Sequence, residues 1–411
     1  MIAVFPLVSA LWGMRGLHGQ VRDWGERVIE ALPVPPDRLS EDDRELWQTA
    51  ILACCSDLAA GRTSRHLARG RMVVRRLHRP ERALDRPAEF ASALFLARNV
   101  YQGIRVIRSG VASAEPEVRL LALALRMNLR ENHGDLTGAL ADAATIANIG
   151  DRADPWFDAI VTMTTASIYG QQARWEAAEV AYRHTIERLQ SIGADEDVRQ
   201  ARAYRIATLC NLGRLDEAQE EYQLLADGWT PAQPDPQGSA ETIASVMLGG
   251  AEIARLRGHA DPALYLRAGE LLARRIPTDS RDPGTEMLLA VALLGVVECG
   301  APELGRGLAT TLVVDEHAMF GVAGYWDLPQ AATMALAIGE YLAALDPESS
   351  YAAALLRIAV RLSGRRDYPV MNAAMVRTVR RYPQDTALSR SRAVRLLRET
   401  ALELRAAGLV D

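Results

Sequence analysis

The chain has 411 residues, of which 49% are hydrophobic and 24% charged, and its formal net charge is −5. This charge gives no overall attraction to nucleic acid or to an anionic membrane, and no stretch reaches the roughly 18 uncharged apolar residues that a membrane span needs. All 47 basic residues are arginine, which excludes lysine-based chemistry, including a P-loop whose lysine binds nucleotide phosphates.

Helices are predicted from end to end. Apolar residues recur at helical spacing, and no segment alternates with period two for long enough to form a sheet. Ser40 followed by Asp43 predicts a capped helix start, with acidic residues in the first turn. In this N-terminal part, single helices or helix pairs are expected over residues 1–17, 20–32, 41–60, 63–78 and 88–109.

A turn pattern recurs along the middle of the chain. A small residue that ends one helix is followed five residues later by a small residue that opens the next. The copies are Gly134 with Ala139, Ala173 with Ala178, Gly213 with Ala218, Gly258 with Ala263, and Gly300 with Gly305. Successive copies are 39, 40, 45 and 42 residues apart. Glycine suits a helix end and a small side chain lets helices approach closely, so the pattern predicts stacked helix pairs.

Acid-proline dipeptides mark where new pairs begin, because proline is well suited to the first position of a helix. They occur at Glu115-Pro116, Asp154-Pro155 and Asp282-Pro283. Two last pairs are expected near residues 328–363 and 370–407. We therefore predict one helical array over residues 1–411, with divergent pairs in 1–110, the clearest repeats in 111–314, and the last pairs and cap in 315–411.

The sequence offers little catalytic chemistry. None of the seven histidines has a second ligand at a useful helical spacing, the four cysteines lack metal-ligand spacing, and Gly-x-Ser-x-Gly is absent. The cysteines are expected to be buried free thiols. The carboxylates Glu217, Glu220 and Glu221 are expected on a solvated helix face. We predict that the chain is not an enzyme and has no cofactor or metal.

Arginines gather between Arg62 and Arg86, where nine of them face only two acidic residues. Four of these arginines follow one helical face and form a candidate docking face: Arg62, Arg65, Arg69 and Arg76. Such a face could bind phosphate or an acidic partner, and the alternatives are a solvated face or an intramolecular docking surface. No recognition helix with base-reading side chains is found, so direct binding of nucleic acid is not expected. The second arginine cluster, from Arg377 to Arg398, is expected on the solvent side of the last helix.

The turn segments NHGDLTGAL, QQARWEAAE and NLGRLDEAQ resemble the tetratricopeptide turn, and Tyr182 and Tyr222 follow the small residue by four positions. The run from Asp154 to Ala218, together with LWGMRGLHGQVRDWGERVIEAL and YWDLPQAATMALAI near the two ends, resembles the helical-repeat region of AfsR/SARP-type transcriptional regulators. This resemblance implies a tetratricopeptide-like α-solenoid, a right-handed superhelix of antiparallel helix pairs. In that family a winged-helix DNA-binding domain and a STAND ATPase module precede the repeats, which act as a sensor arm.

A cytoplasmic location is expected, because no segment is long and apolar enough to span a membrane and the N-terminus lacks the basic region and cleavage site of a secretory signal. The resemblance implies a sensor and interaction module that binds a protein partner or a small effector and has no catalysis of its own. The expected intramolecular partner is an ATPase module absent from this chain. The alternative is a stand-alone tetratricopeptide scaffold that is not tied to transcription. Candidate groove residues are polar positions on the first helix of a pair, and each could equally be an ordinary solvated side chain: Asn128, Thr162, Thr165, Arg202 and Arg205.

Overall fold

A computed structural model describes most of the chain up to residue 349. The described residues are 2–15, 18–55, 65–149, 154–226, 239–275, 283–313 and 328–349, together with 352, 355, 356 and 359. Within these ranges the regular structure is helical and contains no strand. The predicted all-α fold class is thereby confirmed for the described part of the chain. The arginine cluster from Arg377 to Arg398 and the expected pair near 370–407 lie outside it.

The N-terminal helices follow the expected order, with bounds that differ by a few residues. They are α1 (Phe5–Met14), α2 (His18–Ala31), α3 (Glu41–Cys55), α4 (Arg65–Leu77), α5 (Pro87–Leu96) and α6 (Val100–Val111), with the 3₁₀ helix η1 (Pro80–Arg82) between α4 and α5. Ser40 caps α3 as predicted, because its hydroxyl oxygen accepts a hydrogen bond from the Asp43 backbone N–H at 3.1 Å. Asn99 caps α6 in the same way through the Gln102 N–H at 3.0 Å.

The central helices are mostly longer, and two of them begin where the acid-proline dipeptides predict. They are α7 (Pro116–Asn132), α8 (Leu136–Ile149), α9 (Pro155–Gln171), α10 (Trp175–Ser191), α11 (Asp195–Asn211) and α12 (Leu215–Ala226). Pro116 and Pro155 are the first residues of their helices, where a missing N–H costs no helical hydrogen bond. The Asp154 carboxylate also caps α9 by accepting the Trp156 N–H at 2.9 Å.

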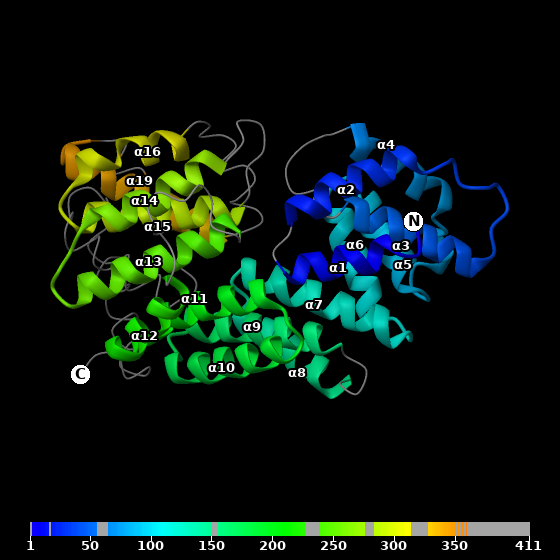
Figure 1. The fold of residues 1–411 in the computed structure, drawn as a ribbon, viewed down its shortest axis with the longest axis horizontal. Helices are drawn as coiled ribbons and strands as arrows, with labels where there is room; N and C mark the ends of the chain where they lie inside the picture. The colour runs from blue at the N-terminus through cyan, green and yellow to red at the C-terminus, as the bar shows by residue number, and fades with distance from the viewer. Residues whose placement is uncertain are drawn as a thin grey trace, which may run out of the picture.

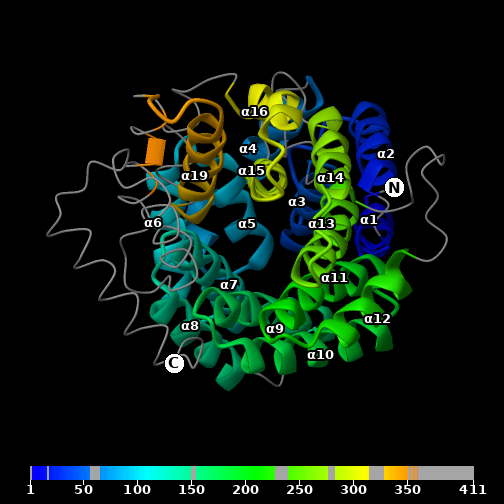
Figure 2. The same ribbon diagram turned by 90° about the vertical axis from the view of Figure 1, so that its left-hand side faces the viewer.

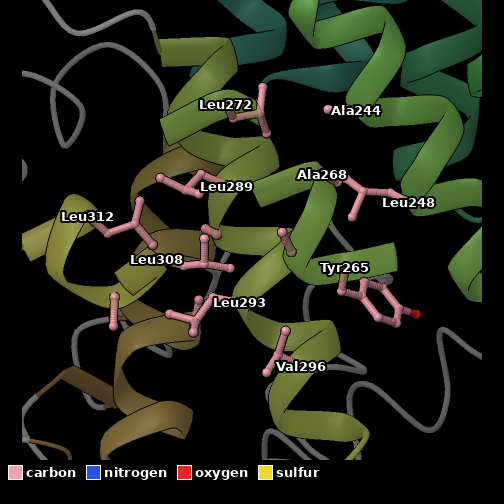
Figure 3. Close-up of a cluster of buried hydrophobic side chains, with 14 of the residues drawn as sticks. Ala244, Leu248, Tyr265, Ala268, Leu272, Leu289, Leu293, Val296, Leu308 and Leu312 are labelled. Carbon is pink, nitrogen blue, oxygen red and sulfur yellow. The ribbon is translucent and has the colours of Figure 1, made fainter. Parts of the chain in front are cut away.

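The C-terminal helices of the described ranges are α13 (Ala240–Leu256), α14 (Pro262–Arg275), α15 (Pro283–Glu298), α16 (Arg306–Val313) and α19 (Leu328–Leu345), with the 3₁₀ helix η2 (Pro302–Gly305) before α16. Figure 3 shows how buried side chains join four of these helices, with Leu248 from α13, Leu272 from α14, Leu293 from α15 and Leu308 from α16. Each buried leucine contributes roughly 1.5–3 kcal/mol of transfer free energy, so this core holds the stack together locally.

All five predicted turn residues have left-handed backbone. The φ angles are 78° at Gly134, 59° at Ala173, 70° at Gly213, 82° at Gly258 and 75° at Gly300. Each residue lies between two consecutive helices, and its N–H bonds a carbonyl of the preceding helix. This conformation ends a helix and reverses the chain, so the repeated pattern does mark the turns within pairs.

The small residue after the turn is buried in four of the five copies. Ala139, Ala178 and Ala218 are fully buried, and Gly305 is buried beside Leu293. The prediction is wrong for Ala263, which is exposed. Residues 259–261 delay the start of α14 to Pro262, so position 263 falls too early in the helix. Tyr265 enters the interface in its place and packs against Gly295 of α15.

The helices form a curved stack in which each packs mainly on its neighbours in the chain (Figure 1). Figure 2 shows α7, α9 and α11 along the inner side of the curve and α8, α10 and α12 along the outer side. The first helices of successive pairs also contact one another, from α7 to α15. Helix α1 lies beside α11, and Met14 packs on a cluster that includes Ala159 and Leu189. The N-terminal helices therefore contact the middle of the stack.

Candidate binding surface

Four of the five predicted groove residues occupy two recurring positions. Thr165 and Arg205 lie eight residues before their turn residue, as Arg126 does, whereas Thr162 and Arg202 lie eleven residues before it. Arginines at these positions face the second helix of the pair. Arg126 donates from Nε and Nη2 to the Asp142 carboxylate at 2.9 and 2.6 Å. The structure therefore directs these two positions into the pair.

Arg202 and Arg205 are brought together on buried acids of the neighbouring helices. Arg202 Nη1 donates to Glu221 at 2.6 Å, and Arg205 binds the same carboxylate. Arg205 also donates from Nη2 to Glu179 of α10 at 2.7 Å. Glu179 and Glu221 are only 4% and 9% exposed. This network joins α10, α11 and α12 and occupies the two guanidinium groups inside the stack.

The sequence prediction was wrong about the exposure of Glu221. It was expected on a solvated face with Glu217 and Glu220, yet it is buried, because it sits eight residues after Gly213 and faces the arginines of α11. Asp142 occupies the same place relative to Gly134. The signal that could have found both pairs is an arginine eight residues before the turn and an acid eight residues after it.

The remaining groove candidates are not drawn into this network. The hydroxyls of Thr162 and Thr165 donate back to their own helix, to the carbonyls of Asp158 and Val161, each at 2.8 Å. Asn128 is exposed on α7. Of the five candidates, Asn128 is therefore the one whose side chain the described structure leaves exposed to solvent.

The candidate docking face on α4 contacts α2 and the segment that follows α2. Arg65 pairs with Glu30, Arg69 donates to the Leu32 carbonyl at 2.8 Å, and Arg76 pairs with Asp37. Arg62 lies outside the described residues. The three described arginines thus hold α4 against α2 and the segment that follows α2.

Two histidines are bound by glutamates from other helices. The His66 ring lies 2.8 Å from Glu30 and 3.5 Å from Glu26, and His78 Nδ1 lies 2.8 Å from Glu89, which is 3% exposed. Spacing within one helix could not reveal these pairs. In the described part of the chain no group of three or more His, Cys, Asp or Glu residues could hold a metal ion. No helix there is both long and apolar enough to cross a bilayer.

A hollow of about 350 Å³ lies between α6, α7 and the turn that follows α7, and we call it the α6–α7 cavity. Its lining residues come from these three elements: Ile104, Ile107, Arg108, Arg126, Leu129, Arg130, His133 and Asp135. Asp142 is 2% exposed and holds both α7 arginines, since Arg130 Nη1 also lies 2.9 Å from it. The sequence did not reveal this site, because its arginines come from two consecutive helices and the faces that these helices turn toward each other depend on the fold.

In the described part of the chain, fold and surface together define a stack of helices with arginine pairs to buried acids and an arginine-lined cavity. No protein-family model matches the chain, and no curated protein matches it significantly. The resemblance to AfsR/SARP-type regulators therefore stays a prediction.

Proposed function

We propose that the chain is a binding module for a protein partner or a small effector, and that it serves as the sensor arm of a bacterial AfsR/SARP-type transcriptional regulator. One observation carries this proposal: a single packing unit recurs along the stack. The left-handed turn occurs at all five predicted positions and again at Gly193, between α10 and α11. The arginine-acid pair recurs at matching positions in Arg126–Asp142 and Arg205–Glu221. Stacked like units form long continuous surfaces that suit binding.

The finer fold, a right-handed tetratricopeptide superhelix, belongs to this proposal. The buried Ala139, Ala178 and Ala218 support it, as does Tyr182, whose ring centroid lies 6.1 Å from that of Tyr204 on the next helix. The spacing of 39 to 45 residues between turns is longer than the usual period of about 34. The longer helices and linkers account for the difference.

In the proposed mechanism, a ligand changes how the stack docks on an ATPase module. A ligand can shift such an equilibrium only by its difference in affinity for the two docked states. The chain itself would supply binding energy and leave ATP hydrolysis and DNA binding to other domains. The purified chain should therefore neither hydrolyse ATP nor retard DNA, and measurable activity of either kind would refute the proposal.

The positive test adds the chain in trans to the ATPase module of an AfsR/SARP-type regulator and measures ATP turnover. We expect a saturable change in the rate. Asn128→Trp should weaken this effect, because Asn128 is exposed on α7, which lies on the inner side of the curve. The matched control is Asn148→Trp, since Asn148 is exposed on the outer helix α8. A chain that captures proteins but leaves ATP turnover unchanged would favour the scaffold alternative, as would an upstream reading frame without an in-phase P-loop.

A further inference from the structure

Among the described residues, the α6–α7 cavity has one more arginine than there are acids facing it. Its arginines are Arg108, Arg126 and Arg130, and the acids that face them are Asp135 and Asp142, with Arg130 Nε 3.4 Å from Asp135. Arg108 is exposed and has no hydrogen bond or ion pair to any described residue. These three arginines and two acids together carry one net positive charge, which lies at Arg108.

The two α7 arginines are held in place before any ligand binds. Arg126 forms a two-point hydrogen bond with Asp142, and Arg130 Nη1 also donates to the Gly138 carbonyl at 2.8 Å. Because Asp142 is almost fully buried, these bonds fix both guanidinium groups against the cavity wall. A site whose walls are fixed in advance loses less conformational entropy on binding.

The rest of the lining is apolar except for His133, whose Nδ1 lies 3.0 Å from the Leu129 carbonyl oxygen, and the space is small. Ile104, Ile107 and Leu129 provide hydrocarbon surface between the arginines. A volume of about 350 Å³ lies at the lower end of the range of roughly 300–1,000 Å³ that is usual for small-molecule sites. This is enough for a small organic molecule and too little for a helix of a protein partner.

We propose that the α6–α7 cavity binds a small monoanion with an apolar body, such as an alkyl or aryl carboxylate, and that this class of ligand is the effector of the module. Arg108 binds the carboxylate, and the body packs against Ile104, Ile107 and Leu129. The effector role rests on the proposed function, whereas the binding site does not. A free phosphate dianion fits less well, because one unpaired arginine supplies too few donors for it and the apolar wall would be left unfilled.

The test is calorimetric titration of the full chain with sodium octanoate, octan-1-ol and sodium acetate. We expect octanoate to bind at one site per chain, and octanol and acetate to bind at least ~10-fold more weakly, because each lacks half of the recognised chemistry. Arg108→Gln should weaken octanoate binding by about 10- to 100-fold, the loss expected for one hydrogen bond to a charged group. Arg105→Gln is the matched control, since Arg105 is exposed on the same helix and does not line the cavity.

A second variant tests the apolar wall. Leu129→Ala should weaken octanoate binding and leave acetate binding unchanged, and its thermal melting curve shows that it is folded. The site is overturned if octanoate does not saturate, if octanol binds as well as octanoate, or if Arg105→Gln weakens binding as much as Arg108→Gln.

The effector role is tested separately, by adding octanoate to the ATPase coupling assay. A shifted coupling curve with the wild-type chain and an unshifted one with Arg108→Gln supports it. Octanoate that binds without shifting the curve overturns the effector role alone. If the wild-type chain binds no octanoate but still changes the ATP turnover of the ATPase module, the proposed site is overturned and the proposed function stands.

Discussion

At the scale of single residues, the buried carboxylates of the described stack are held by arginine side chains, whose planar guanidinium groups can bind at more than one point. Asp142 accepts two parallel hydrogen bonds from Arg126 and a contact from Arg130, and Arg205 likewise bridges Glu179 and Glu221. A lysine ammonium cannot form such a planar two-point bond. In a chain whose basic residues are all arginine, an arginine eight residues before the turn, on the first helix of a pair, can bind one or two buried acids.

Removing the buried carboxylate should therefore lower stability. We expect Asp142→Ala to reduce the free energy of unfolding by about 2 kcal/mol, since two partly buried guanidinium groups lose their acceptor. Their side chains are about a third exposed and can still reach water, which limits the loss. Urea unfolding followed by circular dichroism measures it. Asp216→Ala is the control, because the Asp216 side chain is 98% exposed in its pair with Arg257. Equal effects of the two substitutions would contradict the role given to burial.

The turn residues allow a second comparison at this scale. Gly213 has φ 70° and no atom within 4 Å of an added Cβ, so alanine there meets backbone strain alone. We expect Gly213→Ala to cost about 1 kcal/mol of unfolding free energy. Ala173→Gly should change it by less than ~0.5 kcal/mol, because relief of strain is offset by loss of a buried methyl group and by greater freedom of the unfolded chain. Thermal unfolding of both variants tests this, and a clear loss for Ala173→Gly would show that the strain is small.

At the scale of helices, the sequence predicted their starts and turns well because those signals are local. Proline at a first helical position, a serine cap and a left-handed glycine each act within a few residues. The neighbouring helix that a side chain contacts was predicted less well. Arg202 and Arg205 were chosen as polar groove residues, although their distance from Gly213 directs them toward α12. The exposed Ala263 shows the same limit, because residues 259–261 shift the register of α14.

The α14–α15 crossing, where Tyr265 replaces the expected small residue, gives a prediction for whole helices. A Cβ added to Gly295 would overlap the Tyr265 ring, whose hydroxyl is fixed by Glu252 at 3.1 Å. We expect Gly295→Ala to cost about 1–3 kcal/mol of unfolding free energy through overpacking. The control is Gly103→Ala, where nothing lies within 4 Å and higher helix propensity should stabilise by up to about 1 kcal/mol. Adding Tyr265→Leu to Gly295→Ala should recover part of the lost unfolding free energy. If it recovers none, overlap with the Tyr265 ring is not the cause of the loss.

At the scale of the whole molecule, the described core is a series of local clusters. Val74 and Ile51 belong to a cluster of α1–α4, whereas Leu209 belongs to one of α11–α13 and Leu293 to one of α13–α19. Neighbouring helices make nearly all of these contacts, and the return of α1 to α11 is an exception. No sequence pattern predicted that return, because it depends on the accumulated curvature of many helices. Different parts of such a stack should therefore unfold at different denaturant concentrations.

The cysteines can report on this separation, because they lie in different clusters. Burial raises the pKa of Cys54, Cys55 and Cys210 to about 12, so at pH 8 only about one in ten thousand of each is the reactive thiolate. Cys299 is less buried, and we expect it to react first with iodoacetamide in the native chain, a phase that Cys299→Ser should remove. In rising urea, the Cys54–Cys55 pair and Cys210 should become reactive at different concentrations, which mass spectrometry after pulsed labelling would resolve. Exposure of Cys54, Cys55 and Cys210 at the same urea concentration would instead mean that the contact between α1 and α11 couples the stack into one cooperative unit.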